Sequence, residues 1–324
     1  MALGCVTLDI LMKTLDHWKD RLTEIPGIIE CPEMQLRVHD HEPPVFLGPG
    51  HINIVSSTAI EFTMFASAAD HTDAVRRLNR ARENRYEALQ QFRLFGTDYE
   101  GNEWACGFTR PTVTASPRVG WLLKGALTSL HTSVSSRWVS PQSGVELVFH
   151  PEIRVPTDKS MLAIFSVDGE EVQRKWSAGQ QAIEVLGAEI VFSYPPSSDS
   201  LWVTARTSEK LPLPFLENWL SEPLRILLGD LVFPRLVARN FGDGSAHVSL
   251  RRAPHPFRTS GIAALTGQKP FIATSEFWDL YKSLLAIIAE ARNKKETPTL
   301  SHIRSHDFMK RSFRPLKGRT GCNV

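Results

Sequence analysis

Residues 213–252 read LPFLENWLSEPLRILLGDLVFPRLVARNFGDGSAHVSLRR and combine a helical pattern with a strand pattern. Ser221–Pro223 is typical of a helix start, because a hydroxyl cap, an acid in the first turn and a proline without an amide donor suit that place. The apolar residues that follow have helical spacing, at Leu224, Leu227, Leu228 and Leu231. Pro234 is expected to end the helix. After the turn at 242–244, residues 245–251 alternate, which predicts a strand with His247, Ser249 and Arg251 on its polar face.

Working outward from this stretch, the chain before it is rich in strand patterns and the chain after it is helical. Strand candidates separated by turn residues fill 30–210, interrupted by a helix pattern at 72–91. A further helix pattern begins at Ser275 and continues to about residue 292. We therefore expect an α+β fold, with a β-rich sandwich or open barrel carrying one inserted helix, followed by a helix–strand–helix section.

These patterns divide the chain into four segments. We expect an N-terminal amphipathic helix within 1–29 and the β-rich domain at 30–210. The helix–strand–helix section at 211–292 is expected to pack on that domain. A basic, flexible tail is expected at 293–324, because it contains few large apolar residues.

Composition narrows the class of protein without naming an activity. The chain has 324 residues and a net charge of +2, so it is not globally polybasic. Its four cysteines are isolated in sequence, which argues against a zinc ribbon or a disulfide scaffold and fits a reducing compartment. No apolar run approaches the roughly 18 residues that span a bilayer. We expect a cytoplasmic protein with no membrane association.

The densest group of metal-ligating side chains is His39-Asp40-His41-Glu42. In an extended backbone His39 and His41 would point to the same side, which suits a divalent metal. The competing interpretation is a solvated strand end before Pro43, since no third ligand stands at a recognisable spacing. A metal-dependent hydrolase using His39 and His41 therefore stays one alternative, and otherwise we expect no cofactor.

Two basic segments are candidates for nucleic-acid contact. The helix pattern around Arg76–Arg85 carries several arginines, of which Arg76, Arg77 and Arg80 are the contact candidates. An ordinary solvated face paired with Glu83 and Glu87 would explain the same pattern. The basic tail offers a second candidate surface at Lys310, Arg311 and Arg314.

The segment 98–111 places aromatic residues beside an arginine. Trp104 and Arg110 are the contact candidates there, because an aromatic ring next to a guanidinium can stack on a base or on a peptide. Burial of the aromatic residues in a core is the competing interpretation.

No catalytic motif is present in the sequence. GxSxG, a P-loop and GxGxxG are all missing, and the cysteines lack an informative context. The sequence therefore favours a non-enzymatic function.

The order of elements resembles the N-terminal region of ApeA-type anti-phage defence proteins. In that family a β-rich region leads to a helix, here Phe215–Val232, then a short strand at His247–Arg251 and a helix at Phe277–Ala291. The family places a HEPN ribonuclease domain after this region, marked by arginine, four to six residues, and histidine. That motif does not occur in this sequence, and about 30 residues follow the last helix pattern.

The resemblance implies a sensor or regulatory module without its ribonuclease domain. We therefore expect an interaction module of a prokaryotic defence protein, with a protein partner or a phage component as its ligand. A nucleic-acid-binding protein using the Arg76–Arg85 helix and the tail is the alternative. The sequence does not define an oligomeric state.

Overall fold

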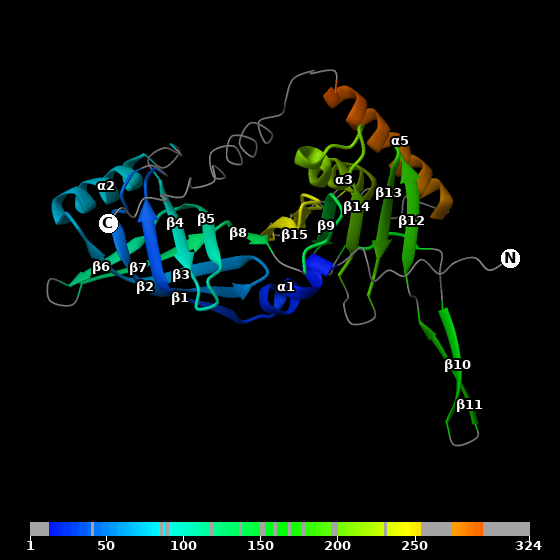
Figure 1. Cartoon of the computed structure of the whole chain (residues 1–324), viewed down its shortest axis with the longest axis horizontal. Helices are drawn as coiled ribbons and strands as arrows, with labels where there is room; N and C mark the ends of the chain where they lie inside the picture. Colours follow the sequence, from blue (N-terminus) through cyan, green and yellow to red (C-terminus); the bar gives the residue numbers. More distant parts are fainter. Residues whose placement is uncertain are drawn as a thin grey trace, which may run out of the picture.

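The computed structural model describes residues 13–39, 42–84, 87, 91–116, 120–135, 138–149, 153–157, 161–167, 170–176, 179–195, 200–229, 232–253 and 274–293. Most strands of this part of the chain join one antiparallel sheet, in the order β12-β13-β14-β9-β15-β16-β8-β5-β4-β1-β2-β3-β7-β6 (Figure 1). The helices are α1 (Lys13–Thr23), α2 (His71–Glu83), α3 (Leu213–Leu228) and α5 (Thr274–Asn293). The predicted α+β class with a large β region is confirmed.

The first half of the sheet consists of the eight strands from the N-terminal part of the chain. They are β1 (Gly27–Arg37), β2 (Phe46–Ser56), β3 (Ala59–Ala68), β4 (Phe92–Thr97), β5 (Glu103–Thr109), β6 (Thr112–Ser116), β7 (Gly120–Leu127) and β8 (Ser129–Ser135). Those of the second half are β9 (Gly144–Phe149), β12 (Gln180–Val185), β13 (Ala188–Ser193), β14 (Trp202–Arg206), β15 (Pro234–Asn240) and β16 (Ser245–Arg251). A separate hairpin pairs β10 (Met161–Val167) with β11 (Glu170–Trp176).

The sheet carries one hydrophobic core on each face. In β15, Leu236 and Ala238 belong to the first core, whereas Val237 belongs to the second. Side chains alternate between the faces of a strand, so a strand between two cores is buried along its whole length. Every residue of β15 is buried. The strands β9 and β15 therefore form a wall shared by both cores, since Val148 of β9 belongs to the first core and Leu147 to the second.

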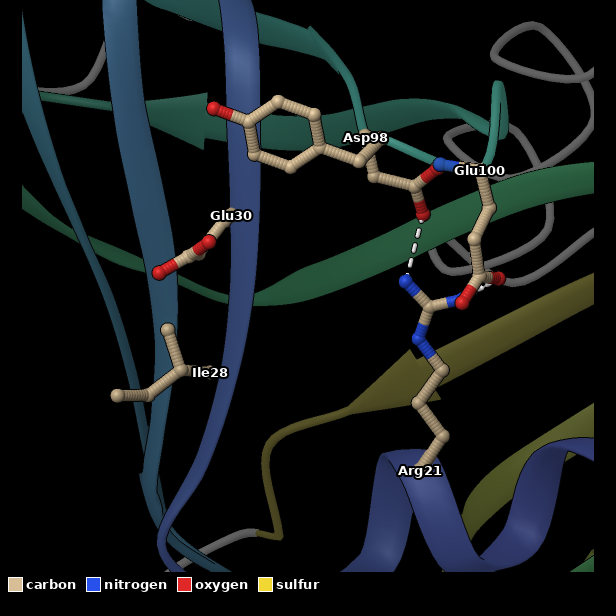
Figure 2. Close-up of a pocket in the computed structure, with 6 residues that line it drawn as sticks. Arg21, Ile28, Glu30, Asp98 and Glu100 are labelled. Carbon is tan, nitrogen blue, oxygen red and sulfur yellow. Dashed lines mark hydrogen bonds and ion pairs between the residues drawn. The ribbon is translucent and has the colours of Figure 1, made fainter.

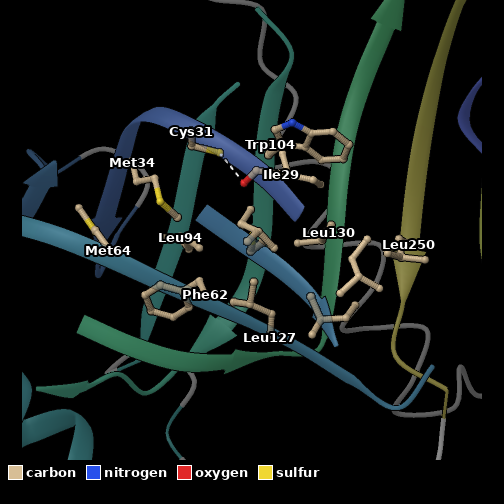
Figure 3. Close-up of a cluster of buried hydrophobic side chains, with 14 of the residues drawn as sticks. Ile29, Cys31, Met34, Phe62, Met64, Leu94, Trp104, Leu127, Leu130 and Leu250 are labelled. Atoms are coloured by element: carbon tan, nitrogen blue, oxygen red, sulfur yellow. Dashed lines mark hydrogen bonds between the residues drawn. The ribbon is translucent and has the colours of Figure 1, made fainter. Parts of the chain in front are cut away.

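The first half of the sheet curls around its own core. The hydroxyl of Thr109 in β5 donates to the carbonyl of Ala126 in β7 at 3.0 Å, although four strands separate β5 from β7 in the sheet. Figure 3 shows the interior of this half, where Phe62, Met64 and Leu127 face the strands that carry Ile29 and Leu130. This half is therefore an open barrel, whereas the sequence predicted a sandwich or an open barrel for the whole of 30–210.

Two helices close this first core. In α1, Leu15, Trp18 and Leu22 are buried against it. Helix α2 begins where Asp70, its N-cap, accepts hydrogen bonds from the amides of Thr72 and Asp73.

Helices α3 and α5 cover the second half of the sheet (Figure 1). Tyr281 of α5 donates its hydroxyl to the carbonyl of Leu220 in α3 at 2.9 Å. The indole of Trp278 donates to the carbonyl of Pro156 at 3.0 Å. Within the described residues no helix is long and apolar enough to cross a membrane.

The predicted start of α3 is wrong. The helix begins at Leu213 with Pro212 as its N-cap, so Pro223 lies inside the helix instead of at its first turn. Ser221 donates its hydroxyl to the carbonyl of Glu217 instead of capping. The helix ends at Gly229, which has a left-handed backbone (φ 65, ψ 25), and Pro234 then begins a strand that the sequence patterns did not predict.

Candidate functional site

An open groove lies where the end of α1, the start of β1 and the turn between β4 and β5 meet (Figure 2). Its volume is about 300 Å³, and its walls are formed by Arg21, Ile28, Glu30, Asp98, Tyr99 and Glu100. The residues come from three separate parts of the chain, so no single sequence motif marks the groove.

The turn at 98–102 is fixed by the carboxylate of Asp98. One carboxylate oxygen accepts from the amides of Glu100 at 3.0 Å and Asn102 at 2.8 Å. The other accepts from the indole of Trp104 at 2.9 Å and the side-chain amide of Asn102 at 2.9 Å. Burial alone would raise the pKa of Asp98, but the hydrogen bonds from Asn102 and Trp104 and the charge of Arg21 lower it. Asp98 is therefore ionised near pH 7, in the wall of the groove.

Arg21 connects α1 to this turn. Its guanidinium pairs with Asp98 at 2.7 Å and with Glu100 at 2.5 Å, as the dashed lines in Figure 2 show. The same guanidinium lies 5.7 Å from the ring centre of Trp18 and 5.8 Å from that of Trp104. Arg21 is thus held in place by two carboxylates and two rings.

The charge and shape of the groove favour a ligand that is both basic and apolar. The lining has three carboxylates, those of Glu30, Asp98 and Glu100, and one cation, that of Arg21, so its net charge is negative. Beside them two apolar side chains face solvent: Ile28 is 65% exposed and Tyr99 is 75% exposed. A lysine or arginine next to an aliphatic or aromatic side chain would find both a charge partner and an apolar contact here.

The structure separates the two contact candidates in the segment 98–111. Trp104 is only 1% exposed and packs against Trp18 with ring centres 5.6 Å apart, so it serves the core and orients Asp98. Arg110 is exposed after the end of β5. The most exposed aromatic residue of the segment is Tyr99, at 75%.

The arginines of α2 are partly neutralised. Arg77 pairs with Glu42 at 2.5 Å and with Asp73 at 2.7 Å, and Arg76 also pairs with Asp73. These acids are not the Glu83 and Glu87 that the sequence spacing suggested. Arg80 is exposed on the same helix. The arginine at position 85 lies outside the described residues, as do the three tail candidates Lys310, Arg311 and Arg314.

The candidate metal ligands are only partly described. His39 is exposed directly after β1, whereas His41 lies outside the described residues. Across the part of the chain that the structure describes, no group of three or more histidine, cysteine, aspartate or glutamate side chains is arranged to hold a metal ion.

A second cluster of charged residues lies beneath α3. Glu217 of α3 is 4% exposed and forms ion pairs with Arg239 of β15 and Arg251 of β16. Burial alone would raise the pKa of Glu217, but the two arginines lower it. The polar face that the sequence predicted for 245–251 is therefore covered by a helix.

Two histidines extend this cluster along the sheet. Arg239 donates to Nδ1 of His247 at 3.1 Å, since arginine has only donors. Burial and the charge of Arg239 lower the pKa of His247 to about 3. His131 of β8 stacks on His247 with ring centres 5.4 Å apart, and burial lowers its pKa as well. Both rings are neutral near pH 7, and the cluster joins α3 to the sheet.

No protein-family model matches the chain, and comparisons with curated proteins and with solved structures give no significant match.

Proposed function

We propose that this chain is a non-catalytic interaction module whose acidic groove binds a basic segment of a protein partner. The carrying observation is the groove itself, whose lining includes three carboxylates, those of Glu30, Asp98 and Glu100, and the exposed side chains of Ile28 and Tyr99. The resemblance to the N-terminal region of ApeA-type defence proteins supports a sensor role for such a module, with a phage component as one class of partner.

The groove is built on hydrogen-bonded elements, which favours binding without a large conformational change. Ile28 and Glu30 lie in β1, where they pair with Asn53 and His51 of β2, and the same strand pairs with β4 further along, from Glu33 to Arg37. The turn that carries Tyr99 is held by the hydrogen bonds of Asp98 and by the ion pairs of Arg21. A preorganised surface loses little conformational entropy on binding.

The charge of the groove selects among partners. A basic segment gains attraction from the carboxylates, whereas a nucleic-acid phosphate would be repelled by them. The exposed apolar side chains provide the contact that buries area, because burial of apolar surface supplies most of the free energy of association. We therefore expect a ligand motif in which a lysine or arginine stands next to a large apolar residue.

A random peptide library displayed on phage tests this expectation. The full chain serves as bait, and a double variant, Ile28→Ser with Tyr99→Ser, serves as counter-bait. Enriched peptides should carry basic residues beside apolar ones, and should bind the double variant at least tenfold more weakly. Their affinity should fall as salt rises from about 50 mM, because the charges are exposed and screened.

A matched control is available on the two helices that cover the second half of the sheet. Ile226→Ser with Ile287→Ser also removes two exposed apolar side chains, from α3 and α5, and should leave the affinity of the selected peptides unchanged. Selected peptides that lack basic residues, or that bind the Ile28 and Tyr99 variant as well as the wild type, would contradict the proposal.

A further inference from the structure

The first part of β1 has a neighbouring strand on one side only. From Gly27 to Cys31 it pairs with β2, whereas its pairing with β4 begins at Glu33 and continues to Arg37. Among the strands that the structure describes, no other strand pairs with β1. The segment 27–31 therefore has an open edge, about 16 Å long at roughly 3.3 Å per residue.

The acidic groove lies along this open edge. Ile28 and Glu30 of the open segment line one side of it, and the turn at 98–102, which follows the end of β4, lines the other (Figure 2). Thr97, the last residue of β4, is the residue that pairs with Glu33. The chain therefore leaves β1 where the open edge begins, and the groove occupies the place of a neighbouring strand.

A β-bulge separates the open segment of β1 from the part that pairs on both sides. The pairing of β1 with β2 shifts by one position between Cys31 and Met34, and Pro32 and Glu33 are both exposed. Pro32 has no amide hydrogen, so it donates no hydrogen bond to a neighbouring strand. Because a bulge interrupts regular pairing, it marks the boundary at which β1 exchanges one neighbour for another.

The open segment combines an available backbone with exposed side chains of two kinds. On a strand with one neighbour, every second residue directs its N–H and C=O groups to the open edge. Ile28 and Glu30 are exposed, whereas Ile29 and Cys31 are each 1% exposed and belong to the first core. An extended peptide can bind such an edge through main-chain hydrogen bonds, and the exposed side chains then select its sequence.

We propose that the basic segment of the partner binds as an additional strand, antiparallel to β1 and paired with residues 27–31. This inference rests on the proposed function, because it specifies how the groove holds its ligand. The antiparallel direction follows from the sheet, in which β1 is antiparallel to both β2 and β4. The negative charge of the groove commits the site to a basic segment, since three of its lining residues are acids and one is a base.

Strand addition sets the spacing of the side chains in the ligand. Residues directly opposite each other form the cross-strand pairs, so a basic residue belongs opposite Glu30 and an apolar residue opposite Ile28. Side chains alternate between the two faces of a strand, so these ligand residues are neighbours in space when they stand two positions apart in sequence. In an antiparallel strand the basic residue comes first.

Fluorescence anisotropy with a labelled, amidated heptapeptide of sequence Ser-Thr-Lys-Thr-Val-Thr-Ser tests the proposal on the full chain. N-methylation removes one backbone donor of the peptide at a time. The amides of an added strand point alternately to β1 and to solvent, so N-methylation of every second residue should weaken binding about tenfold. N-methylation of the residues between them should change the affinity less than twofold.

A peptide of the same composition, Ser-Thr-Thr-Lys-Val-Thr-Ser, is the control for spacing. It places lysine and valine on opposite faces of a strand, so it should bind about threefold more weakly.

Charge reversal tests the register. Glu30→Lys should weaken binding of the first peptide about threefold, and replacing the lysine of the peptide by glutamate should restore it. Glu33→Lys is the matched control, because Glu33 is an exposed acid of the same strand outside the open segment. It should change the affinity less than twofold. Circular dichroism and melting temperature confirm that each variant is folded.

The outcomes separate strand addition from the function of the groove. Strand addition is overturned, and the groove function stands, if binding requires Ile28 and Tyr99 but N-methylation has the same effect at every position. Both are overturned if the first peptide does not bind in low salt, or if Ile28→Ser with Tyr99→Ser binds it as tightly as the wild type.

Discussion

The carboxyl group of Glu146 makes the stability of this fold depend on pH. Glu146 lies in β9 and is 1% exposed. One of its oxygens accepts from the amide of Leu15 in the first turn of α1 at 2.9 Å, and the other accepts from the side-chain amide of Asn240 at 2.8 Å. Thr14 completes the group by donating to Asn240 at 2.7 Å. The carboxyl therefore connects α1 to the two central strands β9 and β15.

Burial raises the pKa of Glu146 from 4.5 to about 7, although the hydrogen bonds from Leu15 and Asn240 work in the opposite direction. The folded state therefore holds the proton more tightly than the unfolded chain does. Its contribution to stability is fully present below pH 4.5 and is lost as pH rises through 7. Since each pKa unit is worth about 1.4 kcal/mol, the loss is about 3 kcal/mol.

Urea unfolding of the wild type and of Glu146→Gln, at several values between about pH 4.5 and pH 8, measures this contribution. Glutamine has nearly the same size as glutamate but no charge to bury. The stability of the Glu146→Gln variant should therefore lack the pH dependence that comes from Glu146. The histidines His131 and His247 act in the opposite direction, because their lowered pKa values cost stability as pH falls below 6.5. They are common to both proteins, so the difference in the free energy of unfolding isolates Glu146.

We expect the wild type to lose about 3 kcal/mol relative to Glu146→Gln as pH rises across this interval. Glu83→Gln removes a carboxylate from an exposed position and serves as the control, which should follow the wild type. A difference between wild type and Glu146→Gln that stays constant with pH would refute the reasoning. It would mean that the donors at Leu15 and Asn240 hold the carboxylate charged at all these pH values.

Two further predictions follow from buried contacts. Glu217→Gln should lower the free energy of unfolding by about 3–5 kcal/mol, because it leaves Arg239 and Arg251 without their common counter-charge, and urea unfolding at pH 7 against Glu222→Gln measures it. Gly50→Ala should destabilise by about 1–3 kcal/mol, because the added Cβ would lie 2.2 Å from the carbonyl oxygen of Thr63, and a melting temperature equal to that of the wild type would contradict it.

The sequence predicted elements well where one local signal determined them. The helix pattern that begins at Ser275 and the strand pattern at 245–251 depend on neighbouring residues, and the structure confirms them as α5 and β16. The start of α3 was misread because Ser221–Pro223 carries the side chains of a cap. There the packing of a longer apolar stripe outweighs the cost of a proline inside the helix, so tertiary contacts decided the boundary.

Residues of the candidate sites were harder to find, because each surface joins distant parts of the chain. Arg21 and Asp98 pair across 77 positions, and Glu217 lies 22 positions from Arg239. The local sequence around each of these residues does not predict its partner. Trp104 shows the converse, since an aromatic beside polar residues is compatible with a surface and with a core, and only the fold places it at 1% exposure.

The alternation of β16 shows that a local pattern does not determine which face of a strand is exposed to solvent. Its polar side chains, His247 and Ser249, resemble a solvated face, yet they are buried because α3 lies on the second side of the sheet. The outer face of the first half has no such helix among the described residues, and β1 runs across it with Glu30 near one end and Arg37 at the other. Seven residues separate them, or about 20 Å along the strand. The groove at the Glu30 end is therefore defined by what the fold brings to β1, namely the end of α1 and the turn at 98–102, and not by the alternation of the strand itself.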